Sequence, residues 1–447
     1  MPPDFWPSFG RALFLCAVAL SLNRVLLPSL AATRLTPRWS VVLWAAIMAP
    51  FLTPPLLTAY AYTKPFLHLS RYPWLEEGAY QFLVFFRVYP LALLAGHCLP
   101  RRLSAEAAYC HRLLDSKKRR FWHFRWRHLE PIHLVTALII FLYAFHEFEM
   151  ASLLQRPAWT VAIFDAQTQG YALGDTWRRL WSVVFIQVAL IVGVLALLRT
   201  KDDRADARSS RGNAARLVAY VSVAACVITL VPVILILTEA MPGLARLPEA
   251  FSMHMEVWHS LSVAFVAATL AYLVARRLAV VRSLRLLGVI LLPGLLGTLL
   301  LSLSMLSLVQ LPGFVALRDR PLPLMFGLAL SVLPILTLLH ALARRREFSE
   351  AGWNVTLSSD RRLRWAYIRG PHLGIWACGF YLAYFEVTTS AILAPASMTP
   401  VMVRLYNLMH YGRDTMLSAY VLVVVAAPLI IVALATALGY GLTSRRG

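Results

Sequence analysis

Residues 132–154 read IHLVTALIIFLYAFHEFEMASLL, and residues 372–393 read HLGIWACGFYLAYFEVTTSAIL. Each stretch follows a proline closely, runs as an apolar segment and then carries glutamate before a small apolar tail. Glu386 follows Glu147 by 239 residues, and the two preceding prolines are 240 residues apart. Because the same features recur in the same order at a nearly constant spacing, the sequence indicates two related halves.

The composition of the chain is typical of a membrane protein. Hydrophobic residues make up 59% of the chain and charged residues 15%, whereas soluble domains carry about 25% charged residues. The apolar residues form eleven blocks, each long enough to cross a hydrocarbon core of about 30 Å as a helix. The blocks are residues 11–30, 40–62, 78–99, 132–154, 180–198, 215–238, 256–275, 284–309, 322–343, 372–393 and 416–442. The sequence therefore predicts an all-α polytopic membrane protein with about 11 transmembrane helices.

The positive charge of the chain is gathered in alternate loops. The net charge is +21, with nine Lys and Arg residues at 101–131 and seven at 344–370. The loops at 199–216 and 276–285 are also basic, whereas the loops between them are nearly balanced in charge. The positive-inside rule then places the basic loops in the cytoplasm, the N-terminus outside and the C-terminus inside. Because the charge follows this alternation, we interpret it as membrane topology and expect no nucleic-acid partner.

Residue patterns for catalysis and for metal binding are missing from the sequence. The five cysteines form no CxxC pair, and no histidine or carboxylate completes the spacing of a metal site. No GxxxxGK[ST] phosphate loop occurs, so any ATP chemistry must belong to another chain. We therefore predict a protein that is not an enzyme and needs no cofactor. The alternative, an integral membrane transferase, would need a catalytic acidic or histidine group at one membrane interface, and the sequence offers none.

The two longest basic loops share a short motif. Glu106-Ala107-Ala108 stands near the start of the first loop, about 101–131, and Glu350-Ala351-Gly352 near the start of the second, about 344–370. A glutamate in the first turn of a helix complements its positive end, and small residues behind it leave a surface that another protein can approach closely. Each loop is therefore expected to carry a short exposed helix that docks on a soluble partner. The alternative is a helix that only anchors the loop to the membrane surface.

With these residues the chain resembles the fused, two-module permease subunits of type I ABC importers, in the ferric-iron group and its thiamine and polyamine relatives. That family carries a loop that begins Glu-Ala-Ala, continues to a glycine and ends at an Ile-x-Leu-Pro step. The two tripeptides match the start of this EAA loop, and Leu129-Glu130-Pro131 and Pro371 are similar to its end. Residues 49–55, APFLTPP, and residues 385–395 also resemble the family. The resemblance covers about residues 40–170 and 256–415.

The resemblance implies two pseudo-symmetric type I ABC permease modules. The first would comprise residues 1–199, a cytoplasmic linker 200–214, and the second residues 215–447. Six spans per module would give twelve, so the first module is expected to lack its opening helix. The ATPase-coupling residues would be Glu106, Ala107, Ala108, Glu350, Ala351 and Gly352.

The resemblance also implies partners, a location and a cargo. The partners would be a dimer of ABC ATPase subunits on the cytoplasmic side and an extracytoplasmic solute-binding protein. The chain would lie in the bacterial inner membrane in contact with lipid. Its function would be binding-protein-dependent transport of ferric iron or another small solute.

Four polar residues near the ends of the two repeated apolar stretches are candidates for the translocation pathway. They are His146, Glu147, Glu149 and Glu386. A charge at the centre of a membrane costs about 2.5–3.5 kcal/mol, so charged residues in apolar stretches are expected to be functional. The alternative is a structural role, in which each glutamate binds a Ser, Thr or backbone group of a neighbouring helix.

Two departures from the family pattern keep another function open. Arg112 and Thr356 stand where the loop glycine would be, and both loops are longer than usual. These features would suit a permease-derived membrane protein that no longer couples to an ATPase.

Overall fold

The computed structural model of the chain falls into two compact units, residues Met1–Pro232 and Val233–Gly447, here called unit 1 and unit 2. The structure describes residues 1–33, 37–98, 131–198, 213–247, 253–281, 283–347, 354–355, 357–358, 367, 370–411 and 415–444. Within these residues all regular structure is helical and no strand occurs, so the predicted all-α class is confirmed.

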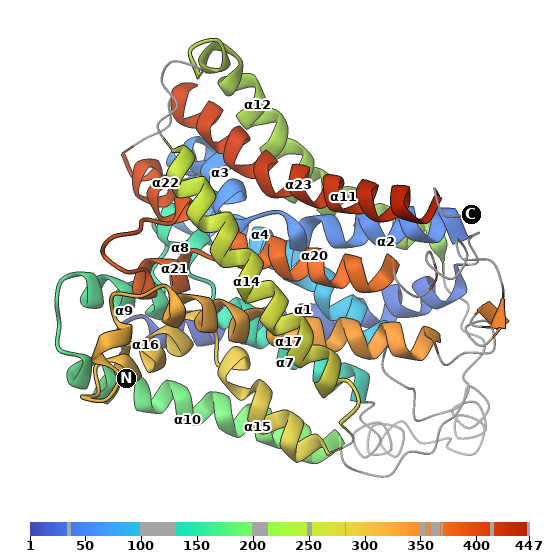
Figure 1. The fold of residues 1–447 in the computed structure, drawn as a ribbon, viewed down its shortest axis with the longest axis horizontal. Helices are drawn as coiled ribbons and strands as arrows, with labels where there is room; N and C mark the ends of the chain where they lie inside the picture. Colours follow the sequence, from blue (N-terminus) through green and yellow to red (C-terminus); the bar gives the residue numbers. More distant parts are fainter. Residues whose placement is uncertain are drawn as a thin grey trace. The chain divides into compact units, whose positions relative to one another are not determined.

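Unit 1 contains ten helical elements and the start of another, among its described residues (Figure 1). They are α1 (Phe5–Ala32), α2 (Pro37–Leu52), α3 (Pro55–Leu69), α4 (Pro73–Cys98), α7 (Pro131–Phe145), α8 (Glu149–Leu153), α9 (Trp159–Thr168), α10 (Leu173–Leu198), α11 (Ala214–Ala225) and the π-helix η1 (Cys226–Leu230). The next helix, α12 (Val231–Leu244), begins at the end of unit 1 and continues into unit 2.

Unit 2 continues with nine further elements in its described part. They are α14 (His254–Leu278), α15 (Leu284–Leu295), α16 (Thr298–Val309), the 3₁₀-helix η2 (Val315–Leu317), α17 (Leu322–Glu347), α20 (Gly370–Tyr384), α21 (Val387–Leu393), α22 (Val401–Met409) and α23 (Thr415–Ser444).

Several of these helices are long and apolar enough to cross a membrane. In the described part of the chain eight stretches meet that requirement, and two bent helix pairs raise the number to as many as ten. Helix α20 has 15 residues, fewer than the roughly 20 that a straight span needs. The structure thus supports a helical membrane protein, and its count of eight to ten described candidates compares with the eleven predicted.

The two bent pairs occur where the sequence cannot continue a straight helix. Helices α2 and α3 meet at 68° across Thr53 and Pro54, because a proline lacks the amide hydrogen of the helical ladder and restricts the residue before it. Helices α15 and α16 meet at 92°, and Gly297 at this bend has a φ of 86°, a left-handed conformation that favours glycine. A proline therefore interrupts the apolar block at 40–62, and a glycine interrupts the block at 284–309.

Within each unit the helices pack in the same order. In unit 1, α7 packs against α1 and α4, α2 packs against α4, and α3 packs against α8. In unit 2, α20 packs against α14 and α17, α15 packs against α17, and α16 packs against α21. Both units therefore contain a helix that packs on two long helices and a bent helix pair whose halves pack on different neighbours.

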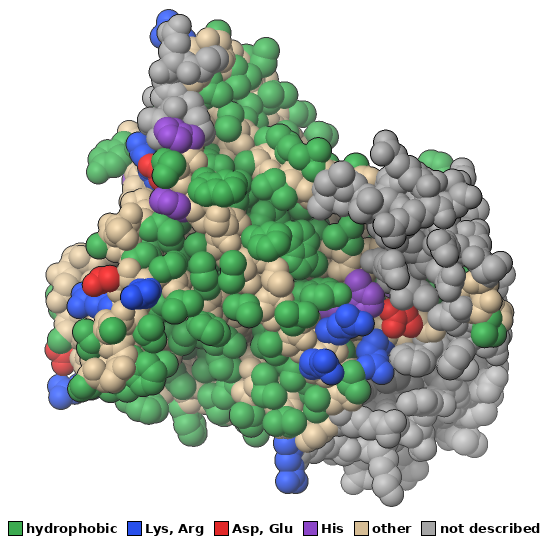
Figure 2. Space-filling model, viewed as in Figure 1, with side chains coloured by type: hydrophobic (Ala, Val, Ile, Leu, Met, Phe, Trp, Pro, Cys, Tyr) green, Lys and Arg blue, Asp and Glu red, His purple; other side chains and the backbone are tan. Residues whose placement is uncertain are grey.

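The surface of α14 carries the side chains expected of a helix that faces lipid. Figure 2 shows hydrophobic side chains over the middle of the face on which α14 lies, with histidine and charged side chains toward its two ends. Phe265 and Leu273 lie on this helix and are 52% and 54% exposed. Large exposed apolar patches are rare on soluble monomers, so this surface also indicates that unit 2 lies in a membrane.

Candidate functional site

The break between α7 and α8 is organised around Glu147. Its carboxylate accepts the backbone N–H groups of Met150 at 2.7 Å and Ala151 at 2.8 Å, and the hydroxyl of Tyr80 donates to it at 2.9 Å. The first amides of a helix have no partner within the helix, so a carboxylate placed here satisfies two of them. Glu147 is 6% exposed and therefore makes these contacts inside the fold. The glutamate predicted for the pathway is a helix cap in this structure.

The carbonyl groups freed on the other side of this break also have partners. The indole Nε1 of Trp159 donates to the carbonyl of Phe145 at 2.8 Å, and the hydroxyl of Thr160 donates to the carbonyl of Glu147 at 2.8 Å. Both donors belong to the first turn of α9, and both are fully buried. Side chains of α9 therefore supply the hydrogen bonds that the carbonyl groups lose where α7 ends, because buried backbone groups need hydrogen-bond partners.

Unit 2 carries an equivalent break between α20 and α21. The carboxylate of Glu386 accepts the backbone N–H of Thr389 at 3.2 Å, three residues along, as Glu147 accepts that of Met150. The bond from Thr389 to Glu386 is longer than that from Met150 to Glu147, and Glu386 is half-buried whereas Glu147 is buried.

A second polar contact is also duplicated. The hydroxyl of Ser8 in α1 accepts the N–H of Trp159, the first residue of α9, at 3.3 Å. The hydroxyl of Ser260 in α14 accepts the N–H of Val401, the first residue of α22, at 2.9 Å. In each unit, therefore, a serine of the first long helix caps the short helix that follows the break.

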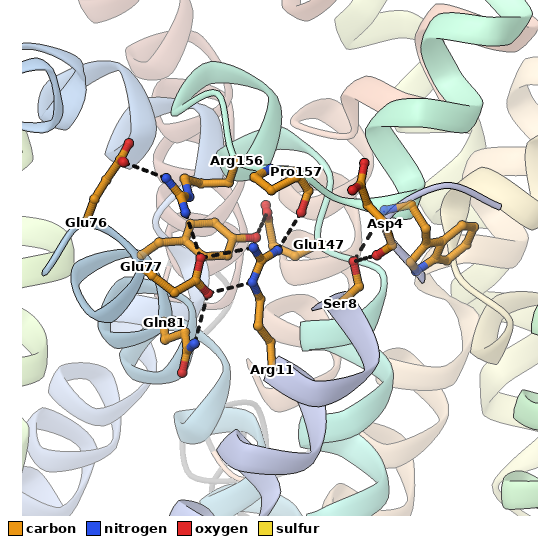
Figure 3. Close-up of polar contacts among 11 residues, drawn as sticks. Asp4, Ser8, Arg11, Glu76, Glu77, Gln81, Glu147, Arg156 and Pro157 are labelled. Carbon is orange, nitrogen blue, oxygen red and sulfur yellow. Dashed lines mark hydrogen bonds and ion pairs between the residues drawn. The ribbon is translucent and has the colours of Figure 1, made fainter. Parts of the chain in front are cut away.

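Four charged side chains join three segments near the break in unit 1 (Figure 3). Arg11 of α1 binds both carboxylate oxygens of Glu77 in α4, at 2.6 and 3.0 Å, and donates to the carbonyl of Pro157 at 2.6 Å. Arg156 binds Glu76 at 2.6 Å and Glu77 at 2.8 Å. The group, which we call the arginine–glutamate cluster, ties α1 and α4 to the segment between α8 and α9.

Arg156 keeps its charge in this setting. Partial burial disfavours the charged form, but the hydrogen bonds and ion pairs with Glu77 and Glu76 outweigh it, so the pKa of its guanidinium is raised above the usual value. Two arginines and two glutamates leave the arginine–glutamate cluster without net charge. Such a partly buried, bidentate network stabilises its geometry more than an exposed pair would.

His146 is directed away from Glu147 and toward α10. Its Nδ1 lies 2.7 Å from the carbonyl of Leu142, and its Nε2 lies 2.7 Å from the amide nitrogen of Gln187. A carbonyl can only accept and an amide nitrogen can only donate, so Nδ1 carries the hydrogen and Nε2 accepts. The ring is therefore neutral in this arrangement, and Gln187, which is fully buried, sets its tautomer.

The structure places the four predicted pathway residues in two separate locations. His146, Glu147 and Glu149 lie at the break in unit 1, where Glu149 is buried in the first turn of α8, and Glu386 lies at the break in unit 2. Their assignment to a translocation pathway stays a prediction. The six predicted coupling residues Glu106, Ala107, Ala108, Glu350, Ala351 and Gly352 lie outside the described residues.

The described residues next to the second loop include one contact between a histidine and a glutamate. Nε2 of His372, at the start of α20, lies 2.9 Å from a carboxylate oxygen of Glu347, the last residue of α17. This contact joins the two helix ends between which the loop runs.

Sequence reasoning missed the partners of the predicted residues. Tyr80, Gln187 and the arginine–glutamate cluster carry no motif that distinguishes them from other polar residues near helix ends. Arg87 had a usable signal, because it is the single charged residue in the apolar stretch of α4 between Glu77 and the end of the helix. No group of three or more His, Cys, Asp or Glu side chains in the described part of the chain is arranged to hold a metal ion.

Comparison with known proteins adds no family assignment. No protein-family model matches the chain, and a search of the curated proteins finds no match. The functional argument therefore depends on the residues and their geometry.

Proposed function

We propose that the chain is the membrane permease subunit of a type I ABC importer, which supplies the translocation pathway and leaves ATP hydrolysis to separate subunits. The observation that carries the proposal is the duplicated break, at which Glu147 and Glu386 each cap the helix three residues ahead. Transporters are commonly built from internal repeats that contain discontinuous membrane helices. A membrane protein without a transport cycle has no comparable need for two matching interrupted helices.

The proposed alignment pairs α1 with α14, α2–α3 with α15–α16, α4 with α17, α7–α8 with α20–α21, α9 with α22, and α10 with α23. Five spans then belong to each module, and the α11–α12 helix lies between them as an eleventh. Counting α20–α21 as one interrupted span reaches this number. The alignment replaces the expectation that the first module lacks its opening helix, because α1 packs on α7 and α4 as α14 packs on α20 and α17.

The intervening α11–α12 span sets the relative orientation of the modules in this proposal. Six spans precede α14, an even number, so α14 enters the membrane from the same side as α1. The modules are then parallel repeats related by an approximate two-fold axis along the membrane normal. Without that span, two five-span repeats would be inverted, and the two EAA-like loops would face opposite sides.

In the proposed cycle the chain forms and breaks no covalent bond. Two conformations, one open to each side, are biased differently by the ATPase dimer and by a solute-loaded binding protein. The loops at about 101–131 and 344–370 dock on the ATPase subunits, and the capped breaks lie toward the extracytoplasmic side. An uncoupled relative of such permeases is the second candidate, because Arg112 and Thr356 occupy the glycine positions of the loops.

Membrane topology gives the first test. A reporter fused after Arg446 is expected in the cytoplasm and one fused to the N-terminus outside, because eleven spans place the two ends on opposite sides. Accessibility of single introduced cysteines to a membrane-impermeant thiol reagent provides the measurement. Both ends on one side would mean that the number of spans is even. That result would contradict the proposed eleven spans, which are five in each module and one between the modules.

Coupling is tested by bulky charged residues on the proposed docking helices. Ala107→Arg and Ala351→Arg are expected to lower solute uptake at least about tenfold while ATP hydrolysis continues. A bulky charged side chain would shift the docking helix on the ATPase subunit without unfolding the chain, and small misplacements can lower rates strongly. The chain is reconstituted with the ATPase subunits and the binding protein encoded beside it. Ala107→Ser and Ala351→Ser serve as matched controls and should transport normally. Normal transport by both arginine variants, or the lack of any ATPase that assembles with the chain, would favour the uncoupled relative.

A further inference from the structure

Arg87 is a charged residue in the middle of a membrane-length helix. It is the fifteenth of the 26 residues of α4, about 21 Å from the start of the helix at a rise of 1.5 Å per residue. Its Nε is buried and has no hydrogen-bond partner, and no ion pair joins it to a carboxylate among the described residues. An ionisable group at this depth indicates a functional site unless a partner accounts for it.

The residues that share a face of α4 with Arg87 are buried inside unit 1. The residues seven before, three before and four after Arg87 lie on the same face of the helix as Arg87. At those places stand Tyr80, Val84 and Leu91, which are 4%, 2% and 3% exposed. Arg87 itself is half-buried, so its side chain lies on the inward face of α4 and is still reached from an accessible space.

One acid, Glu147, interacts with Arg87 without forming an ion pair with it. Their interaction is electrostatic, but the carboxylate and the guanidinium are not close enough to form an ion pair. Both carboxylate oxygens of Glu147 are already occupied by the amides of Met150 and Ala151 and by the hydroxyl of Tyr80. The positive charge of Arg87 therefore retains an unused set of donors in the interior of unit 1.

Unit 2 has no matching charge. The offset of 244 residues between Glu106 and Glu350 places Ser331 of α17, an uncharged and half-buried residue, at the position of Arg87. The charge is therefore specific to unit 1, as a ligand contact can be.

We propose that Arg87 is the anion-binding residue of a solute site in unit 1, and that the transported solute carries an oxyanion, a carboxylate or phosphate group. The guanidinium presents five donors in a planar fork that matches two oxygens of such a group. This inference rests on the proposed function, since it names the class of substrate for that pathway. Glu147 and Glu386, two of the acids predicted for the pathway, are engaged in capping, whereas the guanidinium of Arg87 keeps unused donors. A metal cargo would have to cross as an anionic complex.

The test measures anion binding by the purified full-length chain without any partner. The chain is placed in nanodiscs of zwitterionic lipid, and unfolding is followed with inorganic phosphate, sulfate or citrate against chloride at equal ionic strength. At least one oxyanion is expected to raise the folded-to-unfolded ratio about 100-fold at a hundredfold excess over its Kd, whereas chloride leaves it unchanged. Arg87→Gln should weaken that binding about 10- to 150-fold, and Arg87→Lys should weaken it less.

Arg24→Gln is the matched control, because Arg24 is an exposed arginine of the long apolar helix α1. Its anion response should equal that of the unmodified chain. A second readout separates ligand binding from a structural role. Without anion, Arg87→Met should unfold no more easily than the unmodified chain, because it removes a charge that has no partner. Easier unfolding would show that Arg87 is the counter-ion of Glu147 and overturn the proposal.

Other outcomes also decide the proposal. Stabilisation by ferric or other cations and by none of the three anions would overturn it, as would an anion response that survives in Arg87→Gln. A response to anionic lipid in the nanodisc, without one to the soluble anions, would assign the group to lipid headgroups and likewise overturn a solute site. The anion-binding assay contains no ATPase, so the chain can bind an anion even if it does not couple to an ATPase. The substrate class and the coupling function are therefore tested separately.

Discussion

Glu147→Ala is expected to lower the free energy of unfolding by about 3–5 kcal/mol, enough to remove most of the folded protein. The substitution leaves two buried amides, those of Met150 and Ala151, and the hydroxyl of Tyr80 without an acceptor. The break between α7 and α8 then has no cap on its second helix. Unfolding in mixed micelles of increasing denaturing detergent, followed by tryptophan fluorescence, measures the loss.

Two variants calibrate this expectation. Glu386→Ala should cost about 0.5–2 kcal/mol, the usual value for a helix cap, because its bond to the Thr389 amide is long at 3.2 Å and Glu386 is half-buried. Glu147→Gln keeps the shape but replaces one acceptor by a donor, and should cost about 1–3 kcal/mol. Equal losses from the two alanine substitutions would mean that the hydrogen bonds of Glu147 do not hold the break together.

Gly294→Ala is expected to have the second-largest effect. A Cβ at Gly294 in α15 would lie 2.3 Å from the carbonyl oxygen of Leu330 and 2.8 Å from the ring of Pro334, both in α17. The carbonyl belongs to a helix backbone and cannot rotate away, so the two helices must separate. Overpacking of this kind costs about 1–3 kcal/mol, and the backbone contact places this case toward the upper end.

Gly374→Ala provides the matched control within unit 2. Gly374 lies in α20, and nothing lies within 4 Å of a Cβ built there. This substitution should be neutral or stabilise the helix by up to about 1 kcal/mol, because alanine has the higher helix propensity. The same detergent titration compares both variants. Equal stability of Gly294→Ala and Gly374→Ala would contradict the close approach of α15 to α17.

The polar contacts differ between the units where the duplication is incomplete. Unit 1 has the arginine–glutamate cluster, which joins α1, α4 and the segment before α9. In unit 2 the corresponding region has an ion pair between Arg404 of α22 and Glu256 of α14. The serine contacts are retained in both units, but the charged contacts are built from different helices. The two breaks are thus held with different strength, as the Glu147 and Glu386 variants are designed to measure.

The amino-acid sequence by itself determined the all-helical, membrane-type class of the protein, and it predicts two related halves. Burial of apolar side chains depends on composition and on block length, and both are properties of the linear chain. The order of proline, apolar stretch and glutamate is equally linear, so the duplication could be recognised without coordinates. The interruption at Pro54 follows from the missing amide hydrogen of proline, and the one at Gly297 from the conformational freedom of glycine, and both act locally.

Only the tertiary structure decided what the polar residues do. Whether Glu147 faces a pathway or caps a helix depends on where α7 ends, and that end depends on Trp159 and Thr160 satisfying the freed carbonyl groups. Arg87 could be seen in the sequence as an isolated charge, but its lack of a partner depends on which oxygens of Glu147 are already occupied. Hydrogen bonds are specific at the scale of tenths of an ångström between segments far apart in the chain, and no periodicity or composition encodes that distance.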